Sequence, residues 1–532
     1  MKHLFTALAA AMLFVSCHEK MEIISPETNP DNDRIENTHV IPMDEALANL
    51  EAFMKDSDTK ATDNRSVCSV KPIKLNGYHT KGLSDDYTNV PILYVAQFEG
   101  EQGFAVLAAD DRISHSVIAI IDEGTISSES FDKTWAAMNS EKTIYDEYPS
   151  SGPGLFTTPE RNGELFLNPN TFDYYDESED DTLIGDYDPD GWELINESEE
   201  VIHNKRTFFA CALCIEFALN EIISYEEDTP ETKGGPDTIL DGPWDTPDGP
   251  GTMPGIKKTK TIVSPWSISG RVSPILYKFE DWHQGSPFND LSPRNRKYII
   301  SGHMYKSPSG CVPLALAQIF THFEYPTTFS YNEVLVNYKE LRNCFWSPVG
   351  SESAANLCIG IARSCNSIHL PEGTFTFPYK AISFLRRLKF TNVDDHHYNH
   401  DTVKQMLNEG KPVPTYAIPN HRSIEKKLRY SHCWNIDGYV EKQRTITEEE
   451  YNGMKLIRRT THTETNKLVH CNFGWGRTSN GYYTSGIFDT NKVTLDEGSG
   501  YPKKHHNYSL YLHIISYNLN PNSEFNYSIN WN

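Results

Sequence analysis

Residues 150–260 separate two parts of the chain that have the composition of ordinary folded protein. The stretch contains the acidic block TFDYYDESEDDTLIGDYDPDGWELINESEE and, further on, GGPDTILDGPWDTPDGPGTMPG. A segment so rich in Gly, Pro and Asp cannot hold the hydrogen-bond ladders of a helix or sheet, so we expect an exposed linker there. The chain has 532 residues, which is too long for one ordinary core and favours two or three domains.

The segment after residue 260 predicts helices first and strands second, which is typical of an α+β fold rather than an alternating one. Helical patterns occupy 311–323 and the region near 353–365, followed by PYKAISFLRRLKF and YNHDTVKQMLNEG. Strands are predicted in KPVPTYAI, SHCWNIDGYV, KLVHCNFGWG, NGYYTSGIF and NYSLYLHIISY.

The part before residue 150 predicts a smaller, independent α+β unit. The segment IPMDEALANLEAFMKD, residues 41–56, has its apolar residues at helical spacing. YVAQFEGEQGFAVLAADDR, residues 94–112, indicates two strands around a turn that contains glycine, and residues 116–122 predict a third strand.

The first residues have the pattern of an export signal. Lys2 is followed by a short apolar run that ends near Cys17, and this resembles a bacterial lipoprotein signal with Cys17 as the acylated residue. Plain secretory cleavage is the alternative. We expect residues 1–17 to be a signal peptide, residues 18–40 a tether, and the protein to be a lipoprotein of the cell envelope or outer membrane, or secreted.

Charge and cysteine content exclude some functions. The net charge of −25 repels nucleic acid and anionic lipid, so neither is an expected partner, and a membrane is approached only through the lipid anchor. The 10 cysteines have no regular spacing that implies a disulfide framework. Cys211 and Cys214 form a C-x-x-C pair inside an apolar run, where two packed core thiols are favoured over a redox or zinc pair.

Two further motifs contain residue types that bind metal ions. The run DDHHYNH, residues 394–400, lacks ordered ligand spacing, and a solvated loop is the favoured interpretation. DYDPDGWELINE, residues 186–197, satisfies the pattern of a calcium-binding EF-hand loop, but its acidic surroundings favour a chance match. We therefore predict no metal and no cofactor.

Cys311 stands at the start of a predicted helix, directly after Gly310. Pro313 supports this start, because proline is tolerated in the first turn, where its missing N–H has no partner in the helix. A helix N-terminus favours a nearby negative charge and so lowers the pKa of a thiol. These residues indicate a nucleophile, although a free cysteine of the core would show the same local pattern.

A cysteine nucleophile needs a histidine that pairs with the thiolate and transfers protons. Among the 20 histidines, His432 is the best placed, because SHCWNIDGY alternates as a strand and a strand holds an imidazole rigidly. This strand is expected to end at Asp437 and Gly438, which form a turn signal.

Four motifs resemble those of the streptopain (C10) family of papain-like cysteine peptidases, in the family's order. GCVPLALAQIFTHFEYP resembles its nucleophile motif, and DWHQGSPFN resembles its upstream Gln-x-x-Pro-aromatic-Asn element. SHCWNIDGY resembles its histidine element, and HCNFGWGRTSNGYY resembles its Asn-Trp-Gly-Trp-Gly segment. The resemblance implies a papain-like fold, with a helical part beside an antiparallel sheet part, over about residues 255–532.

The resemblance also assigns roles to five residues. Cys311 would attack the peptide carbonyl as a thiolate, and His432 would act as base and then as acid. Gln284 would donate its side-chain amide to the oxyanion, together with the backbone N–H of Cys311. Asn472 would orient the imidazole, and Trp475 would shield the ion pair from water.

Upstream, YVAQFEGEQGFAVLAADDR resembles the strand pair of the family's inhibitory propeptide. The resemblance implies an inhibitory prodomain over 41–150, an acidic insertion and cleavable linker over 151–260, and a cysteine peptidase domain over 261–532. Exposed loops with Gly and Pro are common sites of proteolysis, so we expect a zymogen that is cut within 230–260. Its expected partners are protein or peptide substrates and its own prodomain.

Five positions depart from the family pattern. Ser431 and Cys433 replace the Gly and Ala beside the histidine, Phe473 replaces a Trp, Arg477 replaces a Gly, and Tyr416 stands where some members have a polar residue. We expect activity with altered specificity, because the side chains of Ser431 and Arg477 narrow the cleft. Two alternatives stay open: a catalytically decayed surface lipoprotein that acts as a binding protein, and an amidase or acyltransferase with the same Cys–His pair.

Overall fold

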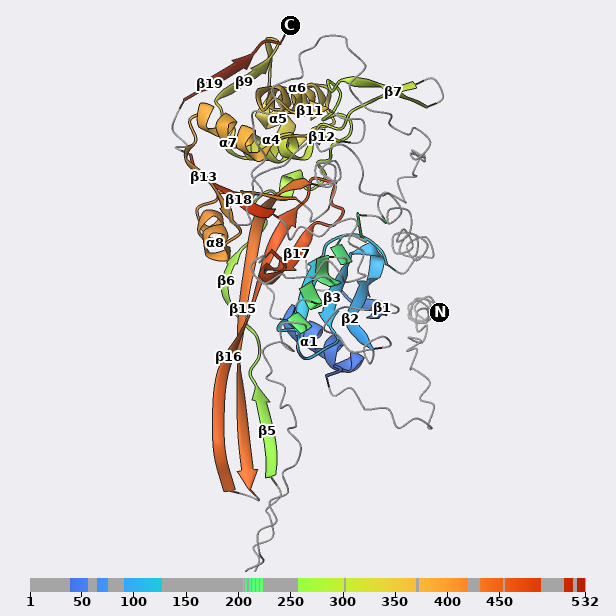
Figure 1. Cartoon of the computed structure of the whole chain (residues 1–532), viewed down its shortest axis with the longest axis vertical. Helices are drawn as coiled ribbons and strands as arrows, with labels where there is room; N and C mark the ends of the chain where they lie inside the picture. The colour runs from blue at the N-terminus through green and yellow to red at the C-terminus, as the bar shows by residue number, and fades with distance from the viewer. Residues whose placement is uncertain are drawn as a thin grey trace, which may run out of the picture.

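The computed structural model describes residues 39–55, 65–74, 90–126, part of 204–222, 257–300, 303–369, 373–418, 431–452, 455–488, 511–519 and 524–531. Helices gather at one end of the molecule, a long β ribbon projects from the other, and the N-terminal elements lie at its side (Figure 1). Mixed helices and a large antiparallel sheet confirm the predicted α+β class.

One 12-stranded sheet organises the molecule, and every strand pair in it is antiparallel. In spatial order its strands are β1 (Val67–Lys74), β2 (Pro91–Phe98), β3 (Phe104–Ala108), β4 (Val117–Ile121), β17 (Gly481–Thr484), β16 (Lys455–Asn472), β15 (His432–Asn452), β14 (Val413–Ile418), β18 (Tyr511–Asn518) and β13 (Thr391–His397). Two more strands, β5 (Lys257–Val263) and β6 (Ser267–Val272), pair with β15.

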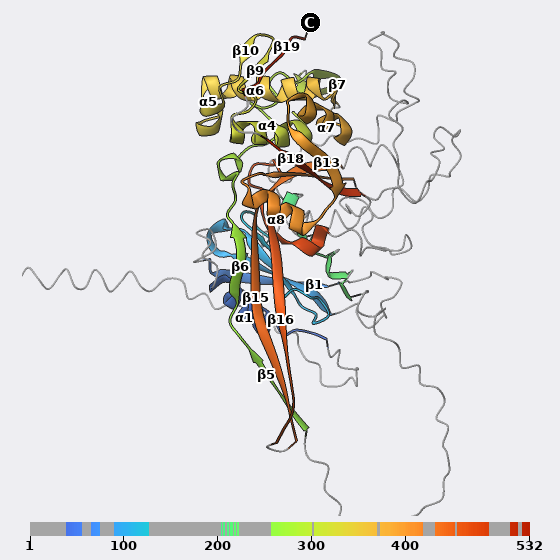
Figure 2. The same cartoon turned by 90° about the vertical axis from the view of Figure 1, so that its left-hand side faces the viewer.

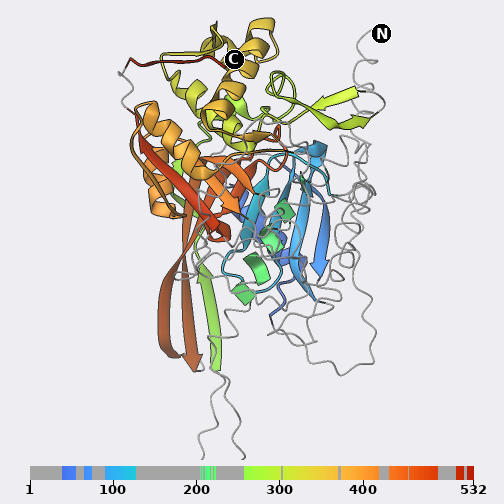
Figure 3. The same cartoon turned by 45° about the horizontal axis from the view of Figure 1, so that its top comes forward.

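The described residues 39–126, here called the N-terminal unit, contain the predicted helix and strands. Helix α1 (Met43–Lys55) buries one face, and β2, β3 and β4 form where the sequence predicted strands, with a short 3-10 turn, η2 (Glu99–Glu101), between β2 and β3. Strand β4 pairs with β17, so the unit extends the sheet of the C-terminal part, and Figure 3 shows the two sheet parts side by side. The unit is therefore not separate in space.

Strands β15 and β16 form a ribbon much longer than the sequence predicted. They pair from Asn435 and Asn472 outward to the tip, and β5 runs beside β15 over the last seven residues (Figure 2). The predicted turn at Asp437 and Gly438 is wrong, because β15 continues through both residues. A side chain at Gly438 would lie 3.0 Å from the carbonyl oxygen of Val272, so this glycine permits a close crossing of the chain.

The helical part confirms the predicted helices. It contains α4 (Cys311–Phe323), α5 (Tyr338–Asn343), α6 (Pro348–Ser364), α7 (Pro378–Arg387) and α8 (His400–Asn408). Around them lie β7 (Arg294–Ile300) with β8 (His303–Lys306), β9 (Thr328–Tyr331) with β10 (Val334–Leu335) and β19 (Asn526–Ile529), and β11 (Ile368–His369) with β12 (Thr374–Phe375). Two further 3-10 turns are η5 (Tyr277–Phe279) and η6 (Ser485–Phe488).

The core runs without interruption from the N-terminal unit to the helices. A single cluster of buried apolar residues includes strands β2 to β4, helix α4 and the helical segment within 204–222. Cys211 and Cys214 of that segment are buried free thiols, which agrees with their interpretation as core residues. Across the described ranges, no helix has the length and apolar character needed to cross a membrane.

Three predicted features lie outside the described residues: the signal and tether before residue 39, the EF-hand pattern at 186–197, and the linker between 223 and 256. The run 394–400 is described, and the loop predicted for it is wrong. Its first residues belong to β13, where Asp395 accepts hydrogen bonds from Tyr416 and pairs with His513.

Candidate active site

Cys311 is the first residue of α4 and is partly exposed. Gly310 precedes it with φ of 99°, a left-handed conformation that favours glycine, and a side chain there would lie 3.0 Å from Thr374. Burial raises the pKa of the Cys311 thiol, whereas the backbone N–H groups of Cys433, Val312 and Cys311 itself lower it. The candidate nucleophile therefore lies against the beginning of β15.

His432 is buried on β15 and held by a backbone atom. Its Nε2 lies 2.9 Å from the carbonyl oxygen of Phe473. A carbonyl oxygen only accepts, so Nε2 carries the hydrogen and Nδ1 is the basic nitrogen of the neutral ring. Burial lowers the pKa of His432 to about 3; the hydrogen bond to Phe473 opposes this shift, and the charge of Arg206 adds to it.

Trp475 covers the imidazole of His432. The two rings are stacked at 4.4 Å between centroids, with 27° between their planes, and Phe473 stacks on Trp475 at 5.3 Å. The side chain of Trp475 therefore lies over the ring of His432.

In the part of the chain that the structure describes, no hydrogen bond joins Asn472 to His432. Asn472 pairs with Asn435 in the ladder, and Asn435 lies an odd number of residues from His432, which places the two side chains on opposite faces. Oδ1 of Asn472 instead accepts from Nε2 of Gln318 at 3.2 Å and from the N–H of Gly474 at 3.1 Å. The Phe473 carbonyl takes the orienting position that was predicted for Asn472.

Gln318 and Asn435 are buried polar residues to which the sequence reasoning gave no role. Asn435 Nδ2 donates to Oε1 of Gln318 at 2.8 Å and to the carbonyl oxygen of Ala315 at 3.0 Å. Together with Asn472, these amides fix the nucleophile helix to the strand of His432. The sequence could have pointed to both residues, because each is an amide within an apolar run and a buried amide requires hydrogen-bond partners.

Gln284 lies beside the nucleophile segment. The N–H of Ser309 donates to the Gln284 carbonyl oxygen at 2.9 Å, and the N–H of Gly476 donates to the Trp282 carbonyl oxygen at 2.9 Å. These bonds attach the loop of Gln284 both to the residues before Cys311 and to the loop of Trp475.

Residues 282–353 and 364–483 match the sequence model of the peptidase C10 family. This part of the chain belongs to the peptidase C10 family. The match spans Gln284, Cys311, His432, Asn472 and Trp475, and it confirms the family that the sequence motifs resembled. A search of curated proteins finds no match to the chain.

The segment that the match spans, residues 282–483, is here called the C10 domain. Arg477 of this domain, which departs from the family pattern, forms ion pairs. Its Nε lies 2.5 Å from Oδ1 of Asp281, and its Nη1 lies 3.7 Å from Glu280. Its backbone N–H also donates to the Glu280 carbonyl oxygen at 2.7 Å. Arg477 therefore ties its own loop to the segment before Gln284.

Arg206, which comes from outside the C10 domain, contacts this site and was missed by the sequence reasoning. Its Nη1 donates to the carbonyl oxygen of Trp475 at 2.9 Å, and Ser479 donates to the Arg206 carbonyl oxygen at 2.6 Å. Burial is the largest cause of the lowered pKa of both His432 and His283, and the positive charge of Arg206 lowers both further. The acidic surroundings of residue 206 gave no signal for this contact.

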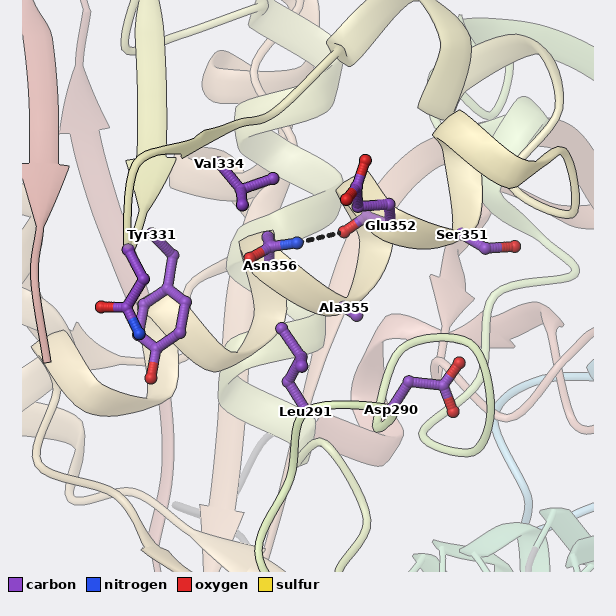
Figure 4. A pocket seen from close by; sticks show the side chains of 9 residues that line it. Asp290, Leu291, Tyr331, Val334, Ser351, Glu352, Ala355 and Asn356 are labelled. Carbon is purple, nitrogen blue, oxygen red and sulfur yellow. Dashed lines mark hydrogen bonds between the residues drawn. The ribbon is translucent and has the colours of Figure 1, made fainter. Parts of the chain in front are cut away.

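A cavity of about 410 Å³ in the C10 domain lies apart from these residues. Figure 4 shows it between the loop of Asp290 and Leu291 and the start of α6, where Asn356 donates to the Glu352 carbonyl oxygen at 2.8 Å. None of the five predicted site residues lines it. In the part of the chain that the structure describes, no group of three or more His, Cys, Asp or Glu could hold a metal ion.

Proposed function

We propose that the chain is the proenzyme of a cysteine endopeptidase, with Cys311 as nucleophile and His432 as general base and acid. Its C10 domain is that of a cysteine peptidase family. The observation that carries the proposal is the contact between α4 and β15, where the backbone N–H of Cys433, the residue after His432, acts on the Cys311 thiol. This contact supports a common site for Cys311 and His432, which are far apart in the sequence.

The orientation of His432 supports its role in proton transfer. Because Nε2 donates to Phe473, the basic Nδ1 is the nitrogen available to take the thiol proton and later give it to the leaving amine. The stacked ring of Trp475 limits the access of water to the imidazolium that forms.

The oxyanion of the tetrahedral intermediate needs donors that are in place before the reaction. The backbone N–H of Cys311 is at the N-terminus of α4, where helix N–H groups have no partner within the helix. The Gln284 loop is bonded to Ser309, two residues before Cys311, and we assign its side-chain amide as the second donor.

We further propose that the N-terminal unit is the prodomain and that Arg206 contributes to latency. No hydrogen bond joins Cys311 to His432 among the described residues. The guanidinium of Arg206 disfavours protonation of His432, and a thiolate–imidazolium pair requires that protonation. Removal of the chain before residue 257 would remove this charge. Export and a lipid anchor at Cys17 remain proposals from the sequence.

The test compares the processed Cys311→Ala variant with its parent in the hydrolysis of a denatured protein. We expect a rate loss of roughly 10³-fold or more, because removal of a covalent nucleophile leaves only binding and oxyanion effects. Cys344→Ala is the matched control, since Cys344 is an exposed free cysteine of the same domain. Hydrolysis by Cys311→Ala at the parental rate would show that the nucleophile is assigned wrongly.

A catalytically decayed binding protein predicts a different result. In that case the processed parent would hydrolyse the denatured substrate no faster than Cys311→Ala. An acyltransferase would instead release the acyl group onto an added amine in preference to water.

A further inference from the structure

A second free thiol, Cys433, lies against the candidate nucleophile Cys311. Cys433 is 5% exposed and directly follows His432 on β15. The family pattern implied by the sequence has alanine at this position, so the thiol is a feature of this chain. Neither the proposed mechanism nor the amide contacts with α4 use it.

The contact between α4 and β15 indicates that Cys311 and Cys433 lie at similar positions along the two elements. Asn435 donates to the Ala315 carbonyl oxygen at 3.0 Å, and this contact aligns the two residues. Cys433 lies two residues before Asn435 and therefore on the same face of the strand, whereas Cys311 lies four residues before Ala315. Two residues of a strand span about 6.6 Å and four residues of a helix span about 6 Å. The distance along β15 from Asn435 to Cys433 is therefore similar to the distance along α4 from Ala315 to Cys311.

The electrostatic environment of each thiol agrees with this placement. The backbone N–H of Cys433 lowers the pKa of the Cys311 thiol against the larger effect of burial. Burial raises the pKa of the Cys433 thiol, and the charge of Cys311 raises it further. Cys433 Sγ is three bonds from that nitrogen, so the two thiols belong to neighbouring residues of the fold.

We propose that Cys311 and Cys433 form a reversible disulfide that switches the nucleophile off under oxidation. The proposal rests on the proposed function, because it takes Cys311 as the reactive thiol. With a hydroperoxide as oxidant, Cys311 first becomes a sulfenic acid and the peroxide is reduced, which releases water from hydrogen peroxide. The Cys433 thiol then attacks the Cys311 sulfur, the S–S bond forms and a second water leaves.

Two electrons pass from the thiols to the peroxide, and two equivalents of an external thiol return them and restore both cysteines. The buried disulfide protects Cys311 from irreversible oxidation to the sulfinic acid. Cys471 does not compete for this role, because it opposes Ile436 in the ladder and so belongs to the other face of the sheet.

The experiment treats the processed enzyme with a small excess of hydrogen peroxide and then with dithiothreitol. The parent is expected to lose at least ten-fold in activity, to yield a cross-linked peptide that joins residues 311 and 433 in non-reducing digests, and to recover fully. Cys433→Ala is expected to lose activity without recovery, with Cys311 found as sulfinic acid. Cys344→Ala should behave as the parent does, because Cys344 is exposed and outside the site.

Inactivated parent without the 311–433 peptide would overturn the proposal, as would full recovery of Cys433→Ala. The cross-linked peptide is a mass measurement and does not depend on peptidase activity. It therefore separates failure of the disulfide from failure of the proposed function, which the Cys311→Ala comparison decides.

Discussion

His470 is a buried histidine that lies between two carboxylates. Its Nδ1 lies 2.6 Å from Asp437 and its Nε2 lies 3.1 Å from Asp122, so both ring nitrogens donate to carboxylates. Burial alone would lower the pKa of His470, but the charge of Asp437 and the hydrogen bonds to Asp122 and Asp437 outweigh it and raise the pKa to about 10. Since Asp122 belongs to the N-terminal unit, His470 links that unit to the C10 domain.

The raised pKa predicts how stability depends on pH. The stabilisation from His470 is fully present below its ordinary pKa of about 6.5 and is lost as pH rises through about 10. We expect the difference in unfolding free energy between the parent and His470→Gln to shrink by about 1–3 kcal/mol from pH 7 to pH 9.5. Urea unfolding at the two pH values measures it, and a pH-independent difference would contradict the assignment.

The sequence predicts a role for a site residue only when that role belongs to its side chain and not to its backbone. Roles for Cys311, His432 and Trp475 could be predicted from the sequence because a nucleophile, a base and an aromatic shield are side-chain functions. The atom that orients His432 is the carbonyl oxygen of Phe473, and a backbone atom leaves no mark in the residue type. The sequence therefore suggested Asn472 as the residue that orients His432, whereas the ring forms its hydrogen bond with the next residue, Phe473.

The seam between β4 and β17 joins the N-terminal unit to the C10 domain. Gly481 opposes Ile121 in this pair, and a side chain at Gly481 would lie 2.4 Å from the carbonyl oxygen of Ile120. Its φ of 153° also lies in a range that other residues rarely adopt. The glycine thus permits the close approach of the two strands.

We predict that Gly481→Ala weakens this seam by about 1–3 kcal/mol, because the added carbon meets backbone atoms that cannot move aside. Hydrogen exchange of residues 117–121 in the full chain should then accelerate at least about ten-fold. Gly373→Ala is the matched control, since a side chain there would meet nothing within 4 Å. Unchanged exchange at residues 117–121 in Gly481→Ala would refute the role of the seam.

Local patterns predicted elements well and their ends poorly. Helix α4 has the predicted bounds, because glycine and proline mark its start and its residues are apolar nearly all round. The pair Asp437 and Gly438 looked like a turn, yet the Asp437 carbonyl oxygen accepts from Ile275 and Gly438 allows Val272 to pass closely. Only the tertiary crossing explains these two residues.

For the whole molecule, one continuous sheet connects the two parts that the linker separates in sequence. Composition predicted two folded parts and their α+β class, but strand pairing between them depends on contacts over hundreds of residues. The contact of Arg206 with the loop of Trp475 also joins residues that are far apart in the sequence, so local patterns do not predict it. Strand β5 also begins at Lys257, just before the predicted start of the peptidase domain at residue 261.

The pairing of β5 with β15 predicts where the proenzyme is cut. A protease needs a locally unpaired chain, and all seven residues of β5 are paired from Lys257 to Val263. The mature chain should therefore begin between residues 230 and 256 and retain β5. N-terminal sequencing of the active form measures this, and a first residue beyond Val263 would be inconsistent with a retained β5.

Cys311 is proposed to be a nucleophile that His432 deprotonates and that stays restrained until the N-terminal unit is removed. A peptide probe with a thiol-reactive group tests it most directly, with labelled residues mapped by mass spectrometry before and after processing. We predict labelling of Cys311 in the processed parent, little labelling in the full chain and almost none in processed His432→Ala. A processed parent whose Cys311 stays unlabelled, or a His432→Ala variant labelled as fast as the parent, would contradict the account.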